Sequence, residues 1–306
     1  MTLGWVAAAG AAILLVALLL IGLHDRHTEP AFEGKELSFW LRLYDSTLRQ
    51  GAIVTDPVNR AEAERALRAI GSNAIPRLIE MIRFQGKGSA QQNSEGASAF
   101  IALQSAGAVA AQSLAGIIEA NSSPSSLWAA GRALSAIGPA ASNAVPALLQ
   151  TAVSTNALRR LISIHALNNI RTDAEKVVPL LAQSFHDDDY AVQQEAVSGV
   201  GKWGSEAQPV LPALLLVAKD RNPRLRRVAC GALGNIGSDP QATIPALQAA
   251  LQDPVPYVRA EAAWALGRFG AKAQVATSAL KELLNDDDKD VRCYAEQALS
   301  NIGKSD

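Results

Sequence analysis

Residues 257–270 read Tyr-Val-Arg-Ala-Glu-Ala-Ala-Trp-Ala-Leu-Gly-Arg-Phe-Gly, and this stretch decides the fold. Its apolar side chains at positions 258, 262, 265, 266 and 269 have the spacing of one helix face. Gly270 closes the stretch, where glycine can take the left-handed conformation that caps a helix. Leu280 and Leu284 follow at helical spacing. The stretch therefore predicts a first helix, a short loop and a second helix.

This pattern returns at a constant interval, and the closing position, here called the marker, is occupied in turn by Gly138, Arg171, Gly204, Gly237, Gly270 and Gly303. The position four residues before each marker holds Leu134, Leu167, Val200, Leu233, Leu266 and Leu299. A fixed period in this range is typical of a solenoid, in which each unit buries its apolar face against its neighbours. We expect an all-α solenoid of about seven or eight helix pairs over residues 61–306.

The ends of the predicted helices also follow this register. Asp189, Asn222 and Asp288 precede the first helices as N-caps, and Pro223 suits a first helical turn. At the marker, Arg171 replaces glycine, and a left-handed conformation costs a non-glycine residue about 1 kcal/mol or more. We therefore expect the helix before Arg171 to end differently from the other five.

Composition and charge restrict the class of protein. Hydrophobic residues make up 49% of the chain but aromatic residues only 5%, which favours closely packed helices. Lys and Arg total 28 against 29 Asp and Glu, so the chain lacks the basic excess of a nucleic-acid-binding protein. Cys230 and Cys293 stand at different positions of the repeat, and we expect no disulfide between them.

Residues 4–23 form an uninterrupted apolar run. As a helix the run would be about 30 Å long, the thickness of the bilayer hydrocarbon. A cleaved signal peptide is the alternative, but no Lys or Arg precedes the run and no small-residue cleavage site follows it. We predict a single-pass membrane anchor over residues 1–27. The side of the membrane that the solenoid faces stays open.

Residues 28–60 are predicted to form a linker with one helix. Leu37, Trp40, Leu41 and Tyr44 have the spacing of one helix face. The helix fits a cap that closes the first repeat. The alternative is an interfacial helix on lipid headgroups, because Phe39, Trp40 and Tyr44 suit that zone.

The repeat resembles the HEAT repeat, and more narrowly the short bacterial variety named after phycobilisome linker lyases. The resemblance is carried by Leu225-Arg226, Ala229, Ala232-Leu233-Gly234-Asn235-Ile236-Gly237 and Pro245-Ala246-Leu247. It extends from about residue 125 to residue 303 and is weaker upstream, where residues 85–96 are a polar insertion. Such a motif specifies a fold far better than a function.

Two enzyme families with similar repeats can be tested on the sequence. The resemblance to deoxyhypusine hydroxylase would require His-Glu pairs for a di-iron centre, but no histidine here is followed by glutamate. A bilin lyase is the alternative function, although no residue set marks a chromophore site. The chain shows no Gly-rich phosphate loop and no metal-spaced His/Cys cluster. We predict neither a cofactor nor catalytic residues.

The aspartates of the run His186-Asp187-Asp188-Asp189 occupy the same register as the acidic run at residues 286–288. A row of carboxylates spaced by a repeat does not converge as calcium requires, and helix capping explains the positions without a metal. Arg226, Arg259 and Arg292 share another register, with Gln193 in an earlier repeat. We expect these arginines to pair with aspartates of neighbouring repeats. The basic cluster at residues 219–227 fits a solvated surface, with an anionic partner or lipid as the alternative.

The sequence favours a membrane-anchored scaffold that binds an unidentified protein partner and no nucleic acid. If the array resembles other HEAT proteins, the second helices line its concave face. The predicted partner-binding face then consists of Ala147, Gln150, Leu180, Gln183, Ala213, Leu216, Ala246, Ala249, Ala279 and Glu282. This small, mildly apolar row suits a helix or an extended segment of a partner. The alternative is that these residues only pack between repeats.

Overall fold

The computed structural model describes residues 30–46, 61–62, 65–66, 69–83, 99, 107–120 and 122–304. The chain forms two compact units, Met1–Ala106 and Gly107–Asp306, called units 1 and 2. The domain limits expected at residues 27 and 60 stay a prediction. The expected anchor at residues 4–23 lies outside the described residues. Among the residues that are described, no helix is long and apolar enough to cross a membrane.

Unit 1 contains a short β-hairpin that departs from the all-α expectation. Its strands β1 (Ala31–Phe32) and β2 (Lys35–Glu36) pair antiparallel. The hairpin forms because Glu33 and Gly34 both take positive φ, 50° and 73°, as a tight two-residue turn requires. The helices α2 (Leu37–Ser46) and α4 (Ile75–Arg83) follow, the latter after the 3₁₀ segment η1 (Gly71–Ala74).

The helix α2 uses the apolar face expected from its spacing. Leu37, Trp40 and Leu41 are all buried. The indole nitrogen of Trp40 donates hydrogen bonds to the carbonyl oxygens of Phe32 and Lys35, at 3.3 and 3.2 Å. These bonds tie the hairpin to the helix, so α2 packs within unit 1.

Unit 2 is built from alternating helices of two kinds. The first helices, each ending at or shortly before its marker, are α7 (Pro124–Ile137), α9 (Ala157–Ile170), α11 (Tyr190–Val200), α13 (Pro223–Ile236), α15 (Pro256–Arg268) and α17 (Lys289–Gly303). The second helices are α6 (Ala108–Glu119), α8 (Val145–Thr151), α10 (Ala174–Gln183), α12 (Leu211–Val217), α14 (Pro240–Ala250) and α16 (Thr277–Glu282). Short 3₁₀ segments flank them: η2 (Gly138–Ala144), η3 (Ser184–His186), η4 (Gly201–Val210), η5 (Gly270–Ala276) and η6 (Leu283–Asn285).

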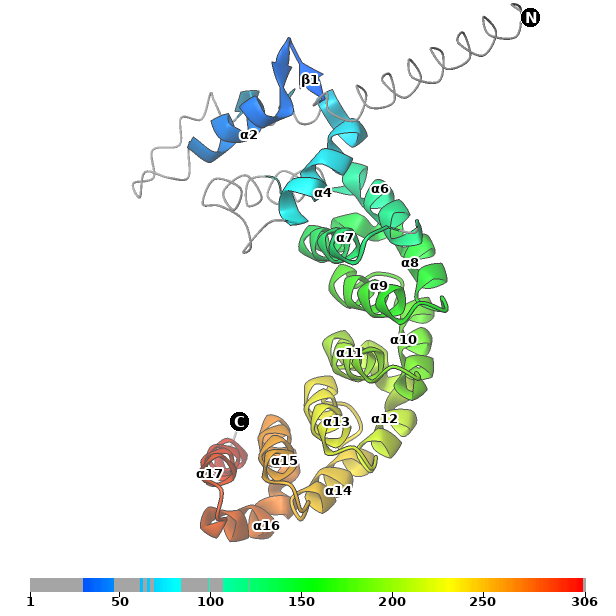
Figure 1. Ribbon diagram of the computed structural model, residues 1–306. Coiled ribbons are helices and arrows are strands. Elements are labelled where there is room, and N and C mark those ends of the chain that lie inside the picture. Colours follow the sequence, from blue (N-terminus) through cyan, green and yellow to red (C-terminus); the bar gives the residue numbers. More distant parts are fainter. Residues whose placement is uncertain are drawn as a thin grey trace, which may run out of the picture. The chain divides into compact units, whose positions relative to one another are not determined.

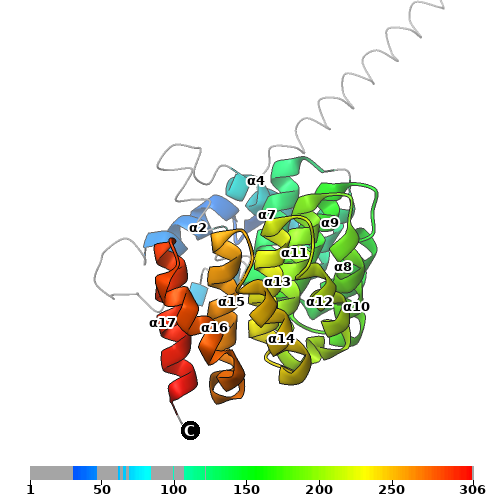
Figure 2. The same cartoon turned by 90° about the horizontal axis from the view of Figure 1, so that it is seen from below.

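Unit 2 curves so that its first helices lie on the inner side of the arc and its second helices on the outer side (Figure 1). Seen from below, α13, α15 and α17 stand side by side (Figure 2). The expectation that the second helices line the concave face is therefore wrong for unit 2. The helix-pair pattern was read correctly, but the pattern does not say which helix of a pair faces inward.

Glycines explain why the first helices lie inside. Gly201, Gly234 and Gly267 stand three residues before successive markers. A β-carbon on Gly234 would lie 2.9 Å from the Cα atom of Ala265, and Gly201 and Gly267 are equally close to the next first helix. Because these positions carry no side chain, the first helices approach each other closely, and the stack bends toward them.

The repeat register defines the core. Leu134, Leu167, Val200, Leu233 and Leu266 are each at most 1% exposed. The residues just before the markers, such as Ile170 and Trp203, are buried as well. The predicted N-caps are also confirmed: Asp189, Asn222 and Asp288 each accept hydrogen bonds from the first turn of α11, α13 and α17. Leu299 in the last repeat is only half-buried, so periodicity located the buried stripe correctly in the five repeats before it.

Two conformations recur at the markers of the first helices, and Arg171 does not stand alone as expected. Arg171 (φ 51°, ψ 48°) and Gly237 (φ 62°, ψ 9°) are both left-handed C-caps. Gly138 and Gly204 combine positive φ with ψ of −140° and −131°, a conformation essentially restricted to glycine. Arginine is tolerated at position 171 because its repeat uses the left-handed cap.

From Gly138 onward, the conformation of the residue at the marker correlates with the length of the second helix that follows. After the two left-handed caps, Asp173 and Asp239 are also left-handed. They lead directly into α10 and α14, which have 10 and 11 residues. The repeats that follow Gly138, Gly204 and Gly270 pass through η2, η4 or η5 into second helices of six or seven residues.

Candidate protein-binding groove

Arginines and aspartates link successive repeats along unit 2. Arg226 donates through Nε and Nη2 to both carboxylate oxygens of Asp253, at 2.6 and 2.8 Å. Arg259 binds Asp286 in the same way at 2.8 and 2.7 Å. The hydrogen bonds from Arg259 hold the pKa of Asp286 below its ordinary value. The expected pairing is confirmed for these two arginines, and its role is to join repeats.

One member of this series was missed in the sequence. Arg160 donates to both oxygens of Asp187, at 2.7 and 2.6 Å. The sequence did contain the information needed to predict this pair, because Arg160 stands one full repeat before Gln193, at the same position of the register. Gln193 itself keeps only the bond to the preceding loop, from Nε2 to the carbonyl oxygen of Asp187 at 2.6 Å.

The acidic runs are accounted for by these pairs and by helix caps. Asp187 and Asp286 bind arginines, while Asp189 and Asp288 cap helices. Among the residues that the structure describes, no group of three His, Cys, Asp or Glu side chains could hold a metal ion.

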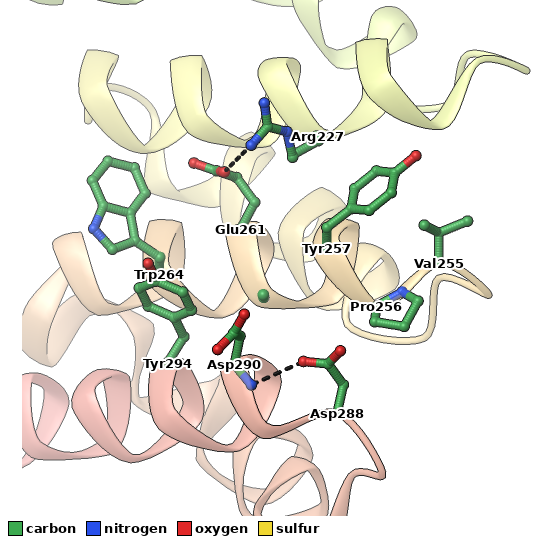
Figure 3. A pocket seen from close by; sticks show the side chains of 10 residues that line it. Arg227, Val255, Pro256, Tyr257, Glu261, Trp264, Asp288, Asp290 and Tyr294 are labelled. Carbon is green, nitrogen blue, oxygen red and sulfur yellow. Dashed lines mark hydrogen bonds and ion pairs between the residues drawn. The ribbon is translucent and has the colours of Figure 1, made fainter.

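A pocket of about 450 Å³ opens on the inner face of unit 2. Three successive first helices line it: Arg227 comes from α13, Tyr257, Glu261 and Trp264 from α15, and Asp290 and Tyr294 from α17. Glu261 and Asp290 lie in the middle of the pocket, with Trp264 and Tyr294 on one side and Tyr257 on the other (Figure 3). Tyr257 and Tyr294 are 42% and 37% exposed. Large aromatic side chains that remain in contact with water favour a binding surface.

A second hollow of about 230 Å³ continues this pocket toward α11. Arg224, Arg227 and Tyr257 line it together with Gln194 and Val228. Because Arg227 and Tyr257 belong to both hollows, the two form one feature. We call it the inner groove, from Gln194 on α11 to Tyr294 on α17.

Glu261 is the most unusual charged residue of the inner groove. Its carboxylate lies 4.0 Å from the guanidinium of Arg227, too far for a hydrogen bond. Burial raises the pKa of Glu261, and the charge of Arg227 offsets only part of this rise. Gly231 makes room for the carboxylate, since a β-carbon there would lie 2.7 Å from Oε1 of Glu261. A half-buried carboxylate without a hydrogen-bonded cation is therefore directed into the pocket.

Glu195 stands at the same position of the register, two repeats before Glu261, and has partners. Its Oε1 lies 3.1 Å from Nδ1 of His165 and accepts a hydrogen bond from Asn168 at 3.3 Å. Burial acts to raise the pKa of Glu195, but His165, Asn168 and the charge of Lys202 bring the pKa below its ordinary value. The same repeat position thus carries a carboxylate with hydrogen-bonded partners in one place and a carboxylate without a hydrogen-bonded cation in the other.

The face expected from the sequence lies elsewhere. All ten residues are on second helices, which occupy the outer side of unit 2 (Figure 1). Five of them are exposed: Gln150, Gln183, Leu216, Ala249 and Glu282. Leu180 is buried, and Ala147, Ala213, Ala246 and Ala279 are half-buried. The outer row exists as a surface, and its binding role stays a prediction.

The residues of the inner groove were not singled out as a site, although a signal was available. Tyr257, Trp264 and Tyr294 are rare aromatic residues in a chain with only 5% aromatic content. They stand outside the apolar stripe that ends at Phe269. An aromatic residue outside the buried stripe must face solvent or a partner, which is the clue that periodicity offered.

Comparison with known proteins supports the repeat type. The HEAT repeats family matches residues 178–242 and 211–300. The chain therefore contains HEAT repeats in this region. No curated protein gives a significant match. The narrower resemblance to the phycobilisome-lyase variety stays a prediction.

Solved structures of Kap121p are similar in fold. The chain matches Kap121p with a TM-score of 0.58 at 16% identity, covering 86% of this chain and 33% of that one. Complexes of Kap121p with Nup53p and with Ste12p each match with a TM-score of 0.55 at 14% identity and the same coverage. The chain thus spans about a third of the length of Kap121p. At these identities the likeness shows the fold, a HEAT/armadillo-like helical solenoid.

Proposed function

We propose that this protein is a scaffold that binds a segment of a partner protein along the inner groove. The observation that carries the proposal is the pocket of about 450 Å³ between α13, α15 and α17, with Tyr257, Trp264 and Tyr294 around it. Aromatic side chains dominate the energetics of protein interfaces because they bury a large area at a small cost in conformational entropy. Three neighbouring repeats contribute to one pocket, so a ligand there contacts a surface that no single repeat provides.

The solenoid fold is suited to this role. HEAT/armadillo-like repeats are typical of protein-interaction modules. Kap121p, whose fold is similar, has been solved in complexes with Nup53p and Ste12p. For the present chain the inner groove supplies what a fold alone does not, namely specific side chains for recognition.

We further propose that residues 4–23 hold this scaffold at a membrane. The support is the length of the apolar run, which at 1.5 Å per residue matches the hydrocarbon thickness of about 30 Å. An anchor would restrict the scaffold to partners at that membrane. The bilin-lyase alternative has no observation in its favour among the described residues.

Affinity capture from detergent-solubilised membranes of the source organism tests the groove. The Tyr257→Ala/Tyr294→Ala variant removes two exposed side chains of the inner groove, and Leu216→Ala removes one from the outer face, where Leu216 is 68% exposed. We expect proteins captured by the parent to be retained by Leu216→Ala and lost with the double variant. Loss with Leu216→Ala and retention with the double variant would place binding on the outer row instead.

The anchor has its own test. The full chain should remain in the membrane fraction after an alkaline carbonate wash, and a chain beginning at residue 28 should not. If both are released equally, residues 4–23 do not anchor the protein.

A further inference from the structure

The pocket of the inner groove is acidic as well as aromatic. Its lining residues include three acidic side chains, Glu261, Asp288 and Asp290, and one basic side chain, Arg227. The carboxylate of Asp288 caps α17 by accepting hydrogen bonds from the backbone N–H groups of Asp290 and Val291, at 2.9 and 3.2 Å. Glu261 lies 4.0 Å from Arg227. Glu261 is half-buried without a hydrogen-bonded cation and Asp290 is exposed, so both carboxylates can accept hydrogen bonds from a ligand.

The aromatic side chains suit the same kind of ligand. The faces of tryptophan and tyrosine rings attract cations through the ring quadrupole. Trp264 already does so within the protein, because the guanidinium of Arg268 lies 5.3 Å from its ring centroid. Tyr257 and Tyr294 are partly exposed on opposite sides of the two carboxylates (Figure 3).

Other occupants fit this arrangement less well. An apolar side chain would take the remaining water from Glu261 and Asp290 without replacing its hydrogen bonds, which is costly. A phosphate or a carboxylate would be repelled by both groups. A cationic side chain neutralises them, and it would add to the partial compensation that Arg227 gives the charge of Glu261, whose pKa is raised by burial.

We propose that the pocket binds a lysine or arginine side chain of an extended basic segment in the partner protein, held between Glu261 and Asp290 and against the neighbouring aromatic rings. This inference rests on the proposed function and names the chemistry of the partner. The volume of about 450 Å³ accommodates such a side chain together with part of its main chain. The adjoining hollow, which Arg224 and Arg227 line, disfavours a second cation there and so orients the segment.

Fluorescence anisotropy with labelled nonapeptides tests the proposal on the full chain in non-ionic detergent. One peptide carries three lysines among alanine and glycine, a second carries arginine at these positions, and a third carries norleucine. We expect the lysine or the arginine peptide to bind about ten-fold or more tightly than the norleucine peptide, because hydrogen bonds to charged groups are the stronger ones. Equal binding of all three peptides, or no binding of either cationic peptide, would overturn the proposal.

Charge-neutralising variants locate the effect. Glu261→Gln and Asp290→Asn should each weaken binding of the preferred cationic peptide about three- to ten-fold. Glu175→Gln is the matched control, because it removes the same charge from an exposed position on the second helix α10, outside both candidate faces. An equal loss with Glu175→Gln would mean diffuse attraction rather than a site. Melting curves by circular dichroism verify that each variant is folded.

Two results separate this inference from the proposed function. If all peptides bind equally and Tyr257→Ala/Tyr294→Ala abolishes binding, the groove binds segments but does not select a cation. If no peptide binds and the double variant captures the same proteins as the parent, the groove is not the interface and both proposals fail.

Discussion

Glu195 and Glu261 occupy one position of the repeat and differ in what surrounds them. Glu195 on α11 contacts His165 on α9 at 3.1 Å. Glu261 on α15 instead packs against Gly231 on α13, which has no side chain to pair with it. His165 and Gly231 are themselves equivalent, two repeats apart. Histidine at the first of these positions gives the carboxylate a partner, whereas glycine at the second leaves the carboxylate without one. In a regular solenoid, a binding site can therefore form where one repeat lacks the side chain that pairs with the carboxylate in another repeat.

The largest expected effect concerns the close packing around Glu195. A β-carbon on Gly199 would overlap the side-chain amide of Asn168, which is fully buried. Gly199→Ala should therefore lower the free energy of unfolding by about 2 kcal/mol or more, because Asn168 must move and lose its bonds to Glu195. Chemical denaturation measures this difference.

Gly231→Ala is the matched variant at the open position. Its β-carbon would meet only the end of the Glu261 side chain, which can rotate away. We expect a cost below about 1 kcal/mol. Equal losses for the two alanine variants would mean that the two regions are packed alike.

Removing the charge of Glu195 comes next in size. Glu195→Gln should destabilise the protein by about 1 kcal/mol at pH 7, because it weakens the bond to His165. Burial acts to raise the pKa of Glu195, but His165, Asn168 and Lys202 together lower it below its ordinary value in the folded state, so the stabilisation from Glu195 is present above the unfolded pKa. That stabilisation disappears as the pH falls through the folded pKa. Unfolding curves at pH 7 and below pH 4 should therefore show the variant approaching the parent in acid, and a constant difference would contradict this account.

The smallest expected effect has the opposite sign. Burial raises the pKa of Glu261 in the folded state, so its ionisation opposes folding as the pH rises above the unfolded pKa. Glu261→Gln should stabilise the protein by a few tenths of a kcal/mol at pH 7 and leave it unchanged in acid. Thermal melts at both pH values measure this. A loss of stability at pH 7 would show that Glu261 is satisfied in the free protein and would remove the contrast with Glu195.

Much of the fold was readable from local patterns. The constant period of the repeat located Leu233 and Leu266 in the core, and Asp189 and Asn222 were recognised as helix caps. These features depend on residues within a few turns of one another. The helix end at Arg171 was read wrongly, because the choice between two cap conformations depends on how the loop enters the next helix.

The sequence by itself determined the repeat, the buried stripe and the pairing of arginines such as Arg226 with aspartates of the next repeat. Only the tertiary structure decided which helices lie inside. That choice follows from the distance between equivalent helices of successive repeats, set by contacts such as that of Gly234 with Ala265. The tertiary structure also determined where the candidate site lies. Arg227, Glu261 and Asp290 belong to three repeats and line one pocket only after the repeats stack. Periodicity describes what each repeat has in common, whereas the inner groove depends on where neighbouring repeats differ.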